Sequence, residues 1–276
     1  MSDVPTTGQI GLLAAGIGAF AAGEIAALAR FWTDQPRVRI AAKICLYTGT
    51  LIGVAVIVWH SIARQSWLPL DDNFDALIWL ALLLALLVAY MQRAHPLRGL
   101  DVFIIPIVIL LLILAAIFGR TKPHAYLEST WSLTHLVGAY GGVVAFSIAA
   151  AGGVMYLLKN RQLRNKKLMP GPGFGSLERL EHLTFVSVSL GFALLTIGLV
   201  TGLVRALDSH GHNSLGPDWY RNPKVVLAFV AWIVYALVLH SPINPSFRGR
   251  RAAMLSVIGF VLMIGTVVAV QFMPAR

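Results

Sequence analysis

Charged residues are scarce in this sequence. They make up 12% of the 276 residues, whereas hydrophobic residues make up 57%. The mean hydropathy is +0.75, far above the value for an ordinary soluble domain. A soluble domain needs a largely polar surface, and this chain has too few charges to cover one. The composition therefore excludes a soluble globular protein and predicts that lipid is the solvent for most of the chain.

Cysteine is nearly absent, since Cys45 is the only one and lies within an apolar run. One cysteine allows no internal disulfide, no CxxC redox pair and no CxxCH site for covalent heme. Cys45 is therefore interpreted as a small core residue. Lysine and arginine are also absent before Arg30. The first apolar run thus lacks the positive start of a cleavable signal peptide, and we expect it to be a permanent helix.

Acidic residues are fewer than basic ones, which gives the chain a net charge of +10. Such a charge could indicate a nucleic-acid partner. The basic residues, however, lie in short stretches between apolar runs rather than on one patch. They are typical of topology signals, and no nucleic-acid binding is expected.

Eight apolar runs have about the length of a transmembrane helix, because crossing a hydrocarbon core of roughly 30 Å takes about 20 residues. No run alternates with a period of two, as the strands of a membrane β-barrel would. The expected fold class is all-α, a polytopic membrane protein with about eight transmembrane helices. The predicted helices cover approximately residues 9–31, 40–62, 74–91, 98–119, 130–158, 180–206, 224–240 and 250–272.

The distribution of lysine and arginine predicts the orientation of these helices. Most of the 22 basic residues flank the first, third, fifth and seventh connections. Cytoplasmic loops carry such an excess, whereas the second connection holds the acidic Asp71, Asp72 and Asp75. Both chain ends are therefore predicted to lie outside the cytoplasm. The expected location is the inner (plasma) membrane of a bacterial cell, with multiple passes.

The longest inside connection, near residues 159–179, joins a basic run to a segment rich in proline and glycine. It is interpreted as a flexible linker that ends where a helix begins at Ser176. No domain boundary is implied, so we expect a single membrane domain over residues 1–276. It would contain four N-terminal helices in 1–120 and a four-helix region in 130–272 with an outer loop at 207–223.

Histidines are the first candidates for chemistry, because ionisable groups are costly inside a membrane. Two histidines at the same depth on facing helices can ligate heme iron from both sides. On the outer side, His135 could pair with His210, His212 or His60, and His124 also lies on this side. A histidine at a helix end is often only hydrogen-bonded at the interface, so spacing alone leaves these pairs undecided.

Three further histidines, His95, His182 and His240, are predicted near the cytoplasmic side. Here His240 could pair with His182 or with a histidine of a partner subunit. His135 and His240 lie too far apart in depth to ligate one metal ion. The sequence thus predicts two separate histidine layers.

A series of small residues follows His135 at spacings of three and four. Such a groove admits either a closely packed helix or a flat ring, and the spacing favours helix packing. Glu24 could relay protons, although a carboxylate reaching to the interface is the simpler interpretation. The small residues are Gly138, Gly142, Ala145, Ala149 and Gly152.

Several other functional classes find no support. The sequence contains no carboxylate pair, no Ser/His/Asp set and no phosphate-binding glycine loop. It also lacks the inverted repeats or paired broken helices of a transporter. His210 and His212 resemble a surface metal site, but no third ligand lies nearby, so they are only a weak indication of zinc binding.

The second half of the chain resembles the cytochrome c assembly family, the CcsA/HemX-like group of heme-handling membrane proteins. The similarity covers roughly residues 130–265, whereas the first four predicted helices match only in number and hydropathy. It is carried by residues 131–140 (WSLTHLVGAY), 177–185 (LERLEHLTF), 191–202 (GFALLTIGLVTG), 222–224 (NPK), 232–240 (WIVYALVLH) and 248–253 (RGRRAA).

The resemblance implies a non-covalently bound heme b. In the family, a tryptophan-rich outer loop ending in Asp-Pro-Lys cradles heme between histidine ligands, and an inner histidine pair receives heme from the cytoplasm. It implies that His135 is an outer iron ligand and His240 an inner one. The other cofactor-binding candidates are His182, His210, His212, Trp219, Asn222, Pro223 and Lys224.

The outer loop departs from the family pattern. Leu215 and Arg221 stand where further tryptophans are expected, and Asn222 stands where the family has aspartate. The family's second outer histidine follows its last helix, and residues 271–276 contain none. Either His210 or His212 replaces that ligand, or the site has lost heme affinity.

The resemblance implies a cytochrome c biogenesis component that binds heme and presents it at the outer face of the membrane. Its expected partners are a second cytochrome c maturation membrane subunit, apocytochrome c and the lipid bilayer. The chain would be at most part of a cytochrome c synthetase complex, with no catalytic residue of its own. The alternative is a non-catalytic, HemX-like regulatory or assembly membrane protein that does not transfer heme.

Overall fold

The structure of the protein is a computed structural model, and all of its regular secondary structure in the described residues is helical. This confirms the predicted all-α class. The described residues are 4–33, 35–94, 99–121, 130–166, 175–207, 219–241 and 248–272.

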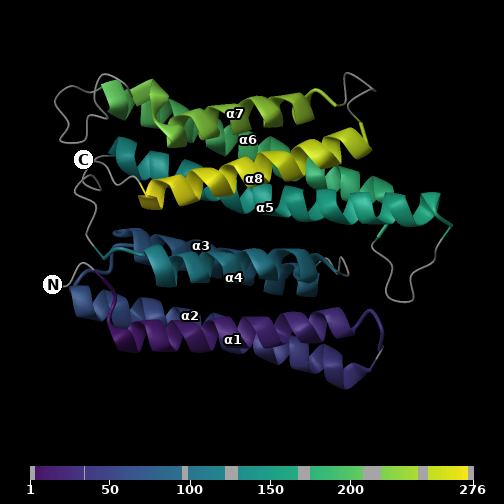
Figure 1. The fold of residues 1–276 in the computed structure, drawn as a ribbon, viewed down its shortest axis with the longest axis horizontal. Helices are drawn as coiled ribbons and strands as arrows, with labels where there is room; N and C mark the ends of the chain where they lie inside the picture. The colour runs from purple at the N-terminus through teal and green to yellow at the C-terminus, as the bar shows by residue number, and fades with distance from the viewer. Residues whose placement is uncertain are drawn as a thin grey trace. The chain divides into compact units, whose positions relative to one another are not determined.

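Eight α-helices form in this part of the chain (Figure 1), and each one corresponds to a predicted apolar run. One short 3₁₀ helix, η1, precedes α7. The bounds are α1 Thr7–Ala29, α2 Pro36–Arg64, α3 Asn73–Ala94, α4 Leu100–Phe118, α5 Thr130–Arg164, α6 Leu177–Leu207, η1 Trp219–Arg221, α7 Pro223–Leu239 and α8 Arg250–Phe272.

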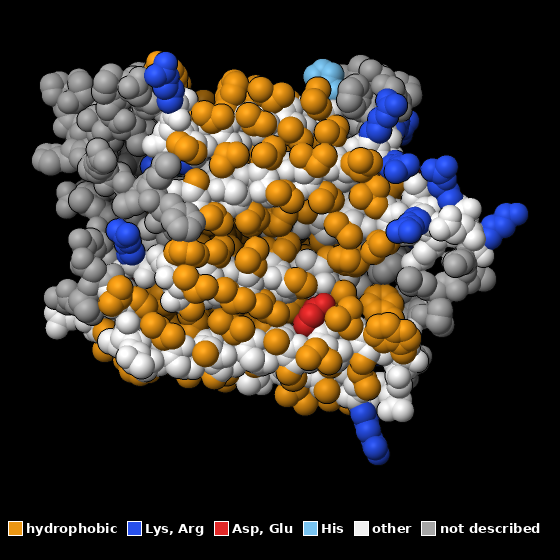
Figure 2. All heavy atoms as spheres, in the orientation of Figure 1, with side chains coloured by type: hydrophobic (Ala, Val, Ile, Leu, Met, Phe, Trp, Pro, Cys, Tyr) orange, Lys and Arg blue, Asp and Glu red, His pale blue; other side chains and the backbone are white. Residues whose placement is uncertain are grey.

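Seven of these helices are long and apolar enough to cross a membrane, and α7 is a shorter apolar helix of 17 residues. A helix of that length spans about 25 Å, close to the thickness of a hydrocarbon core. On the face drawn in Figure 2, apolar side chains cover the middle of the helices and basic side chains gather toward their ends. The chain is therefore a polytopic membrane protein, as predicted.

Local sequence signals explain where several helices begin. Thr6 and Gln9 form a capping box at the start of α1, each side chain pairing with the backbone of the other residue. The hydroxyl of Ser176 accepts a hydrogen bond from the backbone of Arg179, which confirms the helix start predicted there. Pro36 provides a favourable first residue for α2.

The chain divides into two compact units. One contains Met1–Pro123 and Gln162–Gly175, and the other contains His124–Arg161 and Ser176–Arg276. In the first unit, α1 packs on α2 and α4, and α3 packs on α4. Close approach of α1 and α2 depends on Gly49, because a Cβ there would lie 2.9 Å from the ring of the buried Phe20.

The second unit is built around α5 to α8. A Cβ on Gly138 of α5 would lie 2.8 Å from the carbonyl oxygen of Leu194 on α6, so the two backbones pack in direct contact. In the core, the ring of Phe146 on α5 stacks on Tyr235 of α7 with 3.6 Å between centroids. Both rings are fully buried, and they fix the position of α7 against α5.

Candidate functional site

His135 belongs to α5 of the second unit, where it is half buried against α6 near the predicted outer end. Its Nδ1 atom is 2.7 Å from the carbonyl oxygen of Gly198. The ring also packs against Gly202, where an added Cβ would lie 2.9 Å from the ring carbon Cε1. The two glycines of α6 therefore make the space in which this imidazole sits.

The hydrogen bond to Gly198 determines the form of the His135 ring. A carbonyl oxygen can only accept, so Nδ1 carries the proton and donates it. In the neutral ring, Nε2 then has the lone pair. Histidines that ligate metals usually donate their other ring N–H to a carbonyl or carboxylate in this way. His135 thus has the proton on Nδ1, as in many histidines that bind a metal through Nε2.

The groove of small residues below His135 holds a helix rather than a flat ring. Gly138 and Gly142 of α5 face the backbone of α6 at Leu194 and Gly191. Further along α5, Gly152 faces the hydroxyl of Thr184. Of the two interpretations that the spacing allowed, the structure selects close helix packing.

The start of α7 contains three predicted cofactor-binding residues. Asn222 is the N-cap, and its side chain accepts a hydrogen bond from the backbone N–H of Lys224 at 3.2 Å. Pro223 is the first residue of the helix. Just before it, the guanidinium of Arg221 lies 5.6 Å from the centre of the Tyr220 ring. Asn222 therefore performs the capping role that aspartate would perform.

Several of the predicted site residues and histidines lie outside the residues that the structure describes. His210 and His212 are outside the described residues, as are His124 and His95. Trp219 belongs to η1, but its side chain is also outside the description. The assignment of these residues to a heme site stays a prediction.

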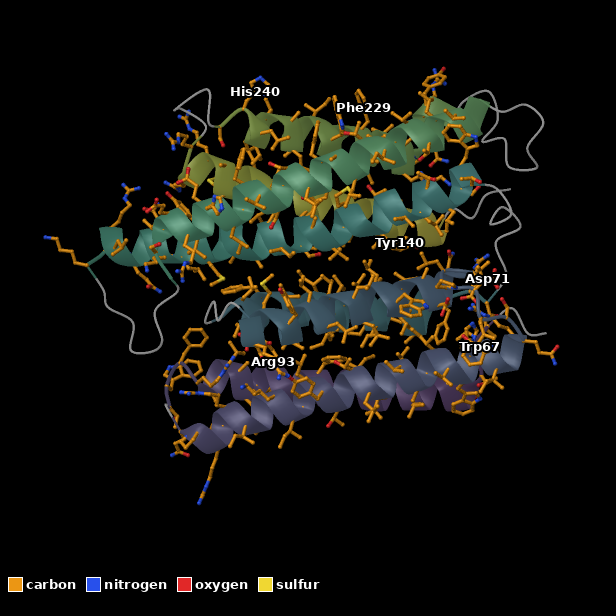
Figure 3. All side chains as sticks on the ribbon, turned by 180° about the vertical axis from the view of Figure 1, so that it is seen from behind. Trp67, Asp71, Arg93, Tyr140, Phe229 and His240 are labelled. Atoms are coloured by element: carbon orange, nitrogen blue, oxygen red, sulfur yellow. The ribbon has the colours of Figure 1, made fainter. Side chains whose placement is uncertain are left out.

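The predicted inner ligands are both exposed. His240 ends α7, and its Nδ1 lies 3.2 Å from the carbonyl oxygen of Ala236 on the same helix. Figure 3 shows its side chain pointing away from the neighbouring helices. His182, in the second turn of α6, is exposed as well. The described residues show no hydrogen bond or ring contact that joins the two histidines.

His60 is a buried histidine whose two ring nitrogens are both engaged. Its Nε2 lies 2.7 Å from the carboxylate of Asp72, and its Nδ1 lies 3.4 Å from Nε2 of Gln9. The Gln9 oxygen already accepts from Thr6, so the amide nitrogen donates to Nδ1 and the imidazole Nε2–H donates to Asp72. No nitrogen is left for iron, so His60 does not suit the pairing with His135.

Arg64 extends this arrangement into a buried ionic cluster at the turn between α2 and α3. Its guanidinium donates to the carboxylates of Asp72 and Asp75, both at 3.2 Å, and to the carbonyl oxygens of Ser66 and Leu68. Asp72 also accepts from the backbone N–H of Asp75 and caps α3. Figure 3 labels Trp67 and Asp71, which belong to this turn. The cluster fixes the α2–α3 turn.

Sequence reasoning missed this cluster because it treated Arg64 and the three aspartates only as topology signals. A usable signal was present, since His60 and Arg64 are four residues apart and thus share one face of α2. That face points at the acidic turn that follows. The partnership itself depends on the fold of the turn.

A second ionic cluster links three helices at the predicted inner end of the first unit. Arg30, just after α1, pairs with Asp101 of α4, and Gln92 of α3 donates to the same carboxylate at 3.0 Å. Glu24 of α1 has a buried oxygen, Oε2, with no hydrogen-bond partner among the described residues. Within that part of the chain, no group of three or more His, Cys, Asp or Glu is placed to hold a metal ion.

The comparisons with known proteins all give relatives from one family. The profile of the family described as "Cytochrome C assembly protein" matches residues 67–274. The chain is 26% identical to the cytochrome c biogenesis protein CcsA of Prochlorococcus marinus strain MIT 9312, with 74% of this chain and 73% of that protein covered. Identity to the CcsA protein of Guillardia theta is 24%, with 80% and 79% covered. For the CcsA protein of Mesostigma viride it is 23%, with 71% of each covered.

Proposed function

Because this chain belongs to the cytochrome c assembly protein family, we propose that it is a cytochrome c biogenesis component that binds heme b and presents it at the outer face of the membrane. The proposed location is the inner (plasma) membrane of a bacterial cell. The proposed partners are apocytochrome c and a second membrane subunit of the maturation machinery. The relatives whose names describe cytochrome c biogenesis support the general role.

One observation carries the heme proposal, the hydrogen bond from His135 Nδ1 to the carbonyl oxygen of Gly198. It fixes the ring in the tautomer with the proton on Nδ1, so Nε2 is the nitrogen that would bind an iron atom. Gly202 keeps space around the ring because any larger residue would collide with it. His135 would hold the heme iron, together with His210 or His212.

The start of α7 would hold the rest of the cofactor. Lys224 and Arg221 are cationic, and cationic side chains bind carboxylates such as heme propionates by charge-assisted hydrogen bonds. Asn222 and Pro223 fix the backbone that carries them. Trp219 would offer an aromatic surface to the macrocycle.

Bound heme would supply the vinyl groups to which the cysteine thiols of an apocytochrome add. This chain contains a single cysteine, so the thiols come from the partner. The residues named here bind and orient, and none acts as a nucleophile. On the inner side, His240 is exposed on the outside of α7, which suits a heme site shared with a histidine of a partner subunit, while His182 is the candidate within this chain.

An absorption spectrum tests the proposal. We expect the detergent-purified protein to show a Soret band whose position changes on reduction. His135→Ala should weaken or shift that band, and added imidazole should restore it by replacing the missing ligand. Thr134→Ala is the matched control, because its hydroxyl only donates to the carbonyl oxygen of Thr130 on the same helix.

The inner site is tested separately with His240→Ala and His182→Ala. Loss of a second heme signal in these variants, with the His135 signal kept, would support two heme layers. Absence of any Soret band, even after heme is added to the wild-type protein, would contradict heme presentation. It would favour the HemX-like alternative, a regulatory or assembly protein that does not transfer heme.

A further inference from the structure

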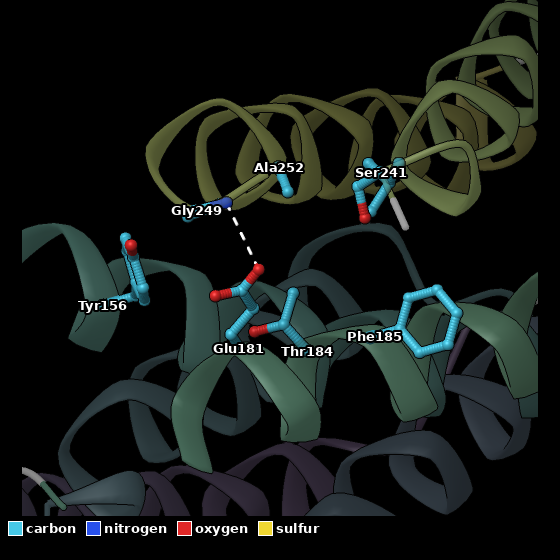
Figure 4. Close-up of a pocket in the computed structure, with 9 residues that line it drawn as sticks. Tyr156, Glu181, Thr184, Phe185, Ser241, Gly249 and Ala252 are labelled. Carbon is cyan, nitrogen blue, oxygen red and sulfur yellow. Dashed lines mark hydrogen bonds between the residues drawn. The ribbon is translucent and has the colours of Figure 1, made fainter. Parts of the chain in front are cut away.

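A small pocket opens at the predicted cytoplasmic end of the second unit, and none of the residues assigned to heme above lines it, although Glu181 and Ser241 are next in sequence to His182 and His240. It is formed where α5, the start of α6, the end of α7 and the start of α8 meet. Figure 4 shows the carboxylate of Glu181 pointing from α6 toward Gly249, with Thr184 beside it. The polar lining residues are Tyr156, Glu181, Thr184 and Ser241.

Thr184 is the least expected member of this group. Thr184 is only 4% exposed, and its hydroxyl oxygen has no hydrogen-bond partner among the described residues. Gly152 makes room for it, because a Cβ there would lie 2.8 Å from that oxygen. A buried hydroxyl without a partner costs stability unless something else supplies one. A hydrogen-bond donor bound in the pocket would give this hydroxyl the partner that it lacks.

Glu181 defines the charge of that occupant. One carboxylate oxygen accepts from the backbone N–H of Gly249 at 3.4 Å, and the guanidinium of Arg248 lies 3.9 Å away and is mostly exposed. Both contacts are long, so the carboxylate can still accept a shorter, charge-assisted hydrogen bond. The pocket offers a carboxylate and hydroxyl oxygens, which together suit a small cation with N–H donors. A primary ammonium group has this chemistry.

The surroundings indicate where such an ammonium group would come from. The pocket lies at helix ends, where lipid headgroups meet a membrane protein. Next to it, Arg248, Arg250 and Arg251 form an exposed basic segment. Basic segments at this depth attract lipid phosphates. An ammonium group and a phosphate joined by a two-carbon link make up the headgroup of an aminophospholipid.

We propose that this pocket binds the ammonium group of an aminophospholipid of the inner leaflet, while the segment from Arg248 to Arg251 contacts its phosphate. Glu181 and Thr184 accept hydrogen bonds from the ammonium, and the rings of Tyr156 and Phe185 line the pocket around it. The lipid would join the ends of α6 and α8 at the cytoplasmic surface. This inference is independent of whether the protein binds heme.

The test compares two lipids that differ only at the nitrogen. Delipidated full-length protein is mixed with phosphatidylethanolamine or with phosphatidylcholine of the same acyl chains, and retained lipid is counted by native mass spectrometry. We expect about tenfold stronger retention of phosphatidylethanolamine, because methylation removes every N–H donor. Equal retention of the two lipids would overturn the proposal.

Variants then assign the preference to the pocket. Glu181→Gln and Thr184→Val should each reduce the preference for phosphatidylethanolamine, and the valine fits because it keeps the shape of threonine. Arg248→Gln should weaken both lipids alike by removing a phosphate contact. Glu178→Gln is the matched control, since Glu178 is exposed on the first turn of the same helix and does not line the pocket.

Two further results would contradict the proposal. An equal loss of preference in Glu178→Gln would assign the effect to general surface charge. Binding of free ethanolamine without any preference between the lipids would assign the pocket to a soluble amine. A folding defect in Glu181→Gln leaves Thr184→Val as the deciding variant, because the wild-type hydroxyl makes no bond that the fold could lose.

Discussion

At the scale of single residues, the hydrogen bonds of an imidazole decide what its second nitrogen can do. In His60 both nitrogens are engaged, by Gln9 and by Asp72, so the ring serves structure. In His135 the carbonyl oxygen of Gly198 engages Nδ1 and fixes the proton on that nitrogen. The two imidazoles therefore lie in different polar surroundings, which their sequence positions do not reveal.

The side chain of Arg64 is a second example at the residue scale. Its guanidinium pairs with two buried carboxylates, those of Asp72 and Asp75. Arg64→Gln would leave both carboxylates buried without their cation, and we expect it to lower the free energy of unfolding by about 3–5 kcal/mol. Thermal unfolding in detergent measures the effect.

The matched control for that prediction is Arg37→Gln, at the other end of the same helix, where the arginine is exposed. Its effect should stay within about 0.5 kcal/mol. If the two variants unfold at the same temperature, the Arg64 cluster does not stabilise the α2–α3 turn.

At the scale of helices, glycine spacing determines how closely two helices pack. Gly138→Ala would place a Cβ 2.8 Å from the carbonyl oxygen of Leu194, a backbone atom that can yield only if α6 moves. We expect a loss of about 1–3 kcal/mol in the free energy of unfolding, the usual cost of overpacking. Unfolding by denaturant in detergent measures this loss.

Gly11→Ala is the control for the same chemical change, because a Cβ at Gly11 meets nothing within 4 Å. Alanine is the better helix former, so this variant should gain about 0.5–1 kcal/mol. A loss as large as that of Gly138→Ala would mean that glycine matters here for reasons other than helix contact.

The start of α7 gives a second prediction at this scale. Asn222→Ala removes the side chain that accepts from the Lys224 backbone, and it should cost about 1 kcal/mol of stability. Asn222→Asp should keep the stability, because aspartate caps a helix equally well. Thermal unfolding of the three proteins tests this, and equal stability of Asn222→Ala would rule out the cap.

At the scale of the whole molecule, each of the two compact units has its own buried core, around Phe20 in the first and around Phe146 and Tyr235 in the second. The outward faces of the helices carry large apolar side chains, among them Ile25 and Leu51, each about 70% exposed. In water these surfaces would aggregate, whereas in lipid they are solvated. The bilayer is thus part of what stabilises the fold.

The predicted orientation is tested by cysteine labelling. In a Cys45→Ser background, Pro69→Cys at the α2–α3 turn should react with a membrane-impermeant maleimide in spheroplasts, whose inner membrane is intact. Asn165→Cys, just after α5, should react only after permeabilisation, because its connection carries the basic excess. Both positions are exposed. The opposite labelling pattern would reverse the predicted topology.

Sequence alone determined the number, approximate bounds and apolar character of the eight helices. These properties are local: run length and hydropathy set them, and capping residues such as Ser176 mark their ends. The two histidine layers stay a prediction from the sequence. The sequence could not decide whether the small residues after His135 contact a helix or a flat ring, because both require the same spacing.

Only the tertiary structure decided which polar groups meet. His135 and Gly198 are 63 residues apart, and Gln9 and His60 are 51 apart, so no local pattern links them. Hydropathy adds up along the chain, whereas a hydrogen bond depends on the distance and angle between two particular groups. The sequence therefore determined that this protein crosses the membrane, and the packing of its helices decided which groups each histidine meets.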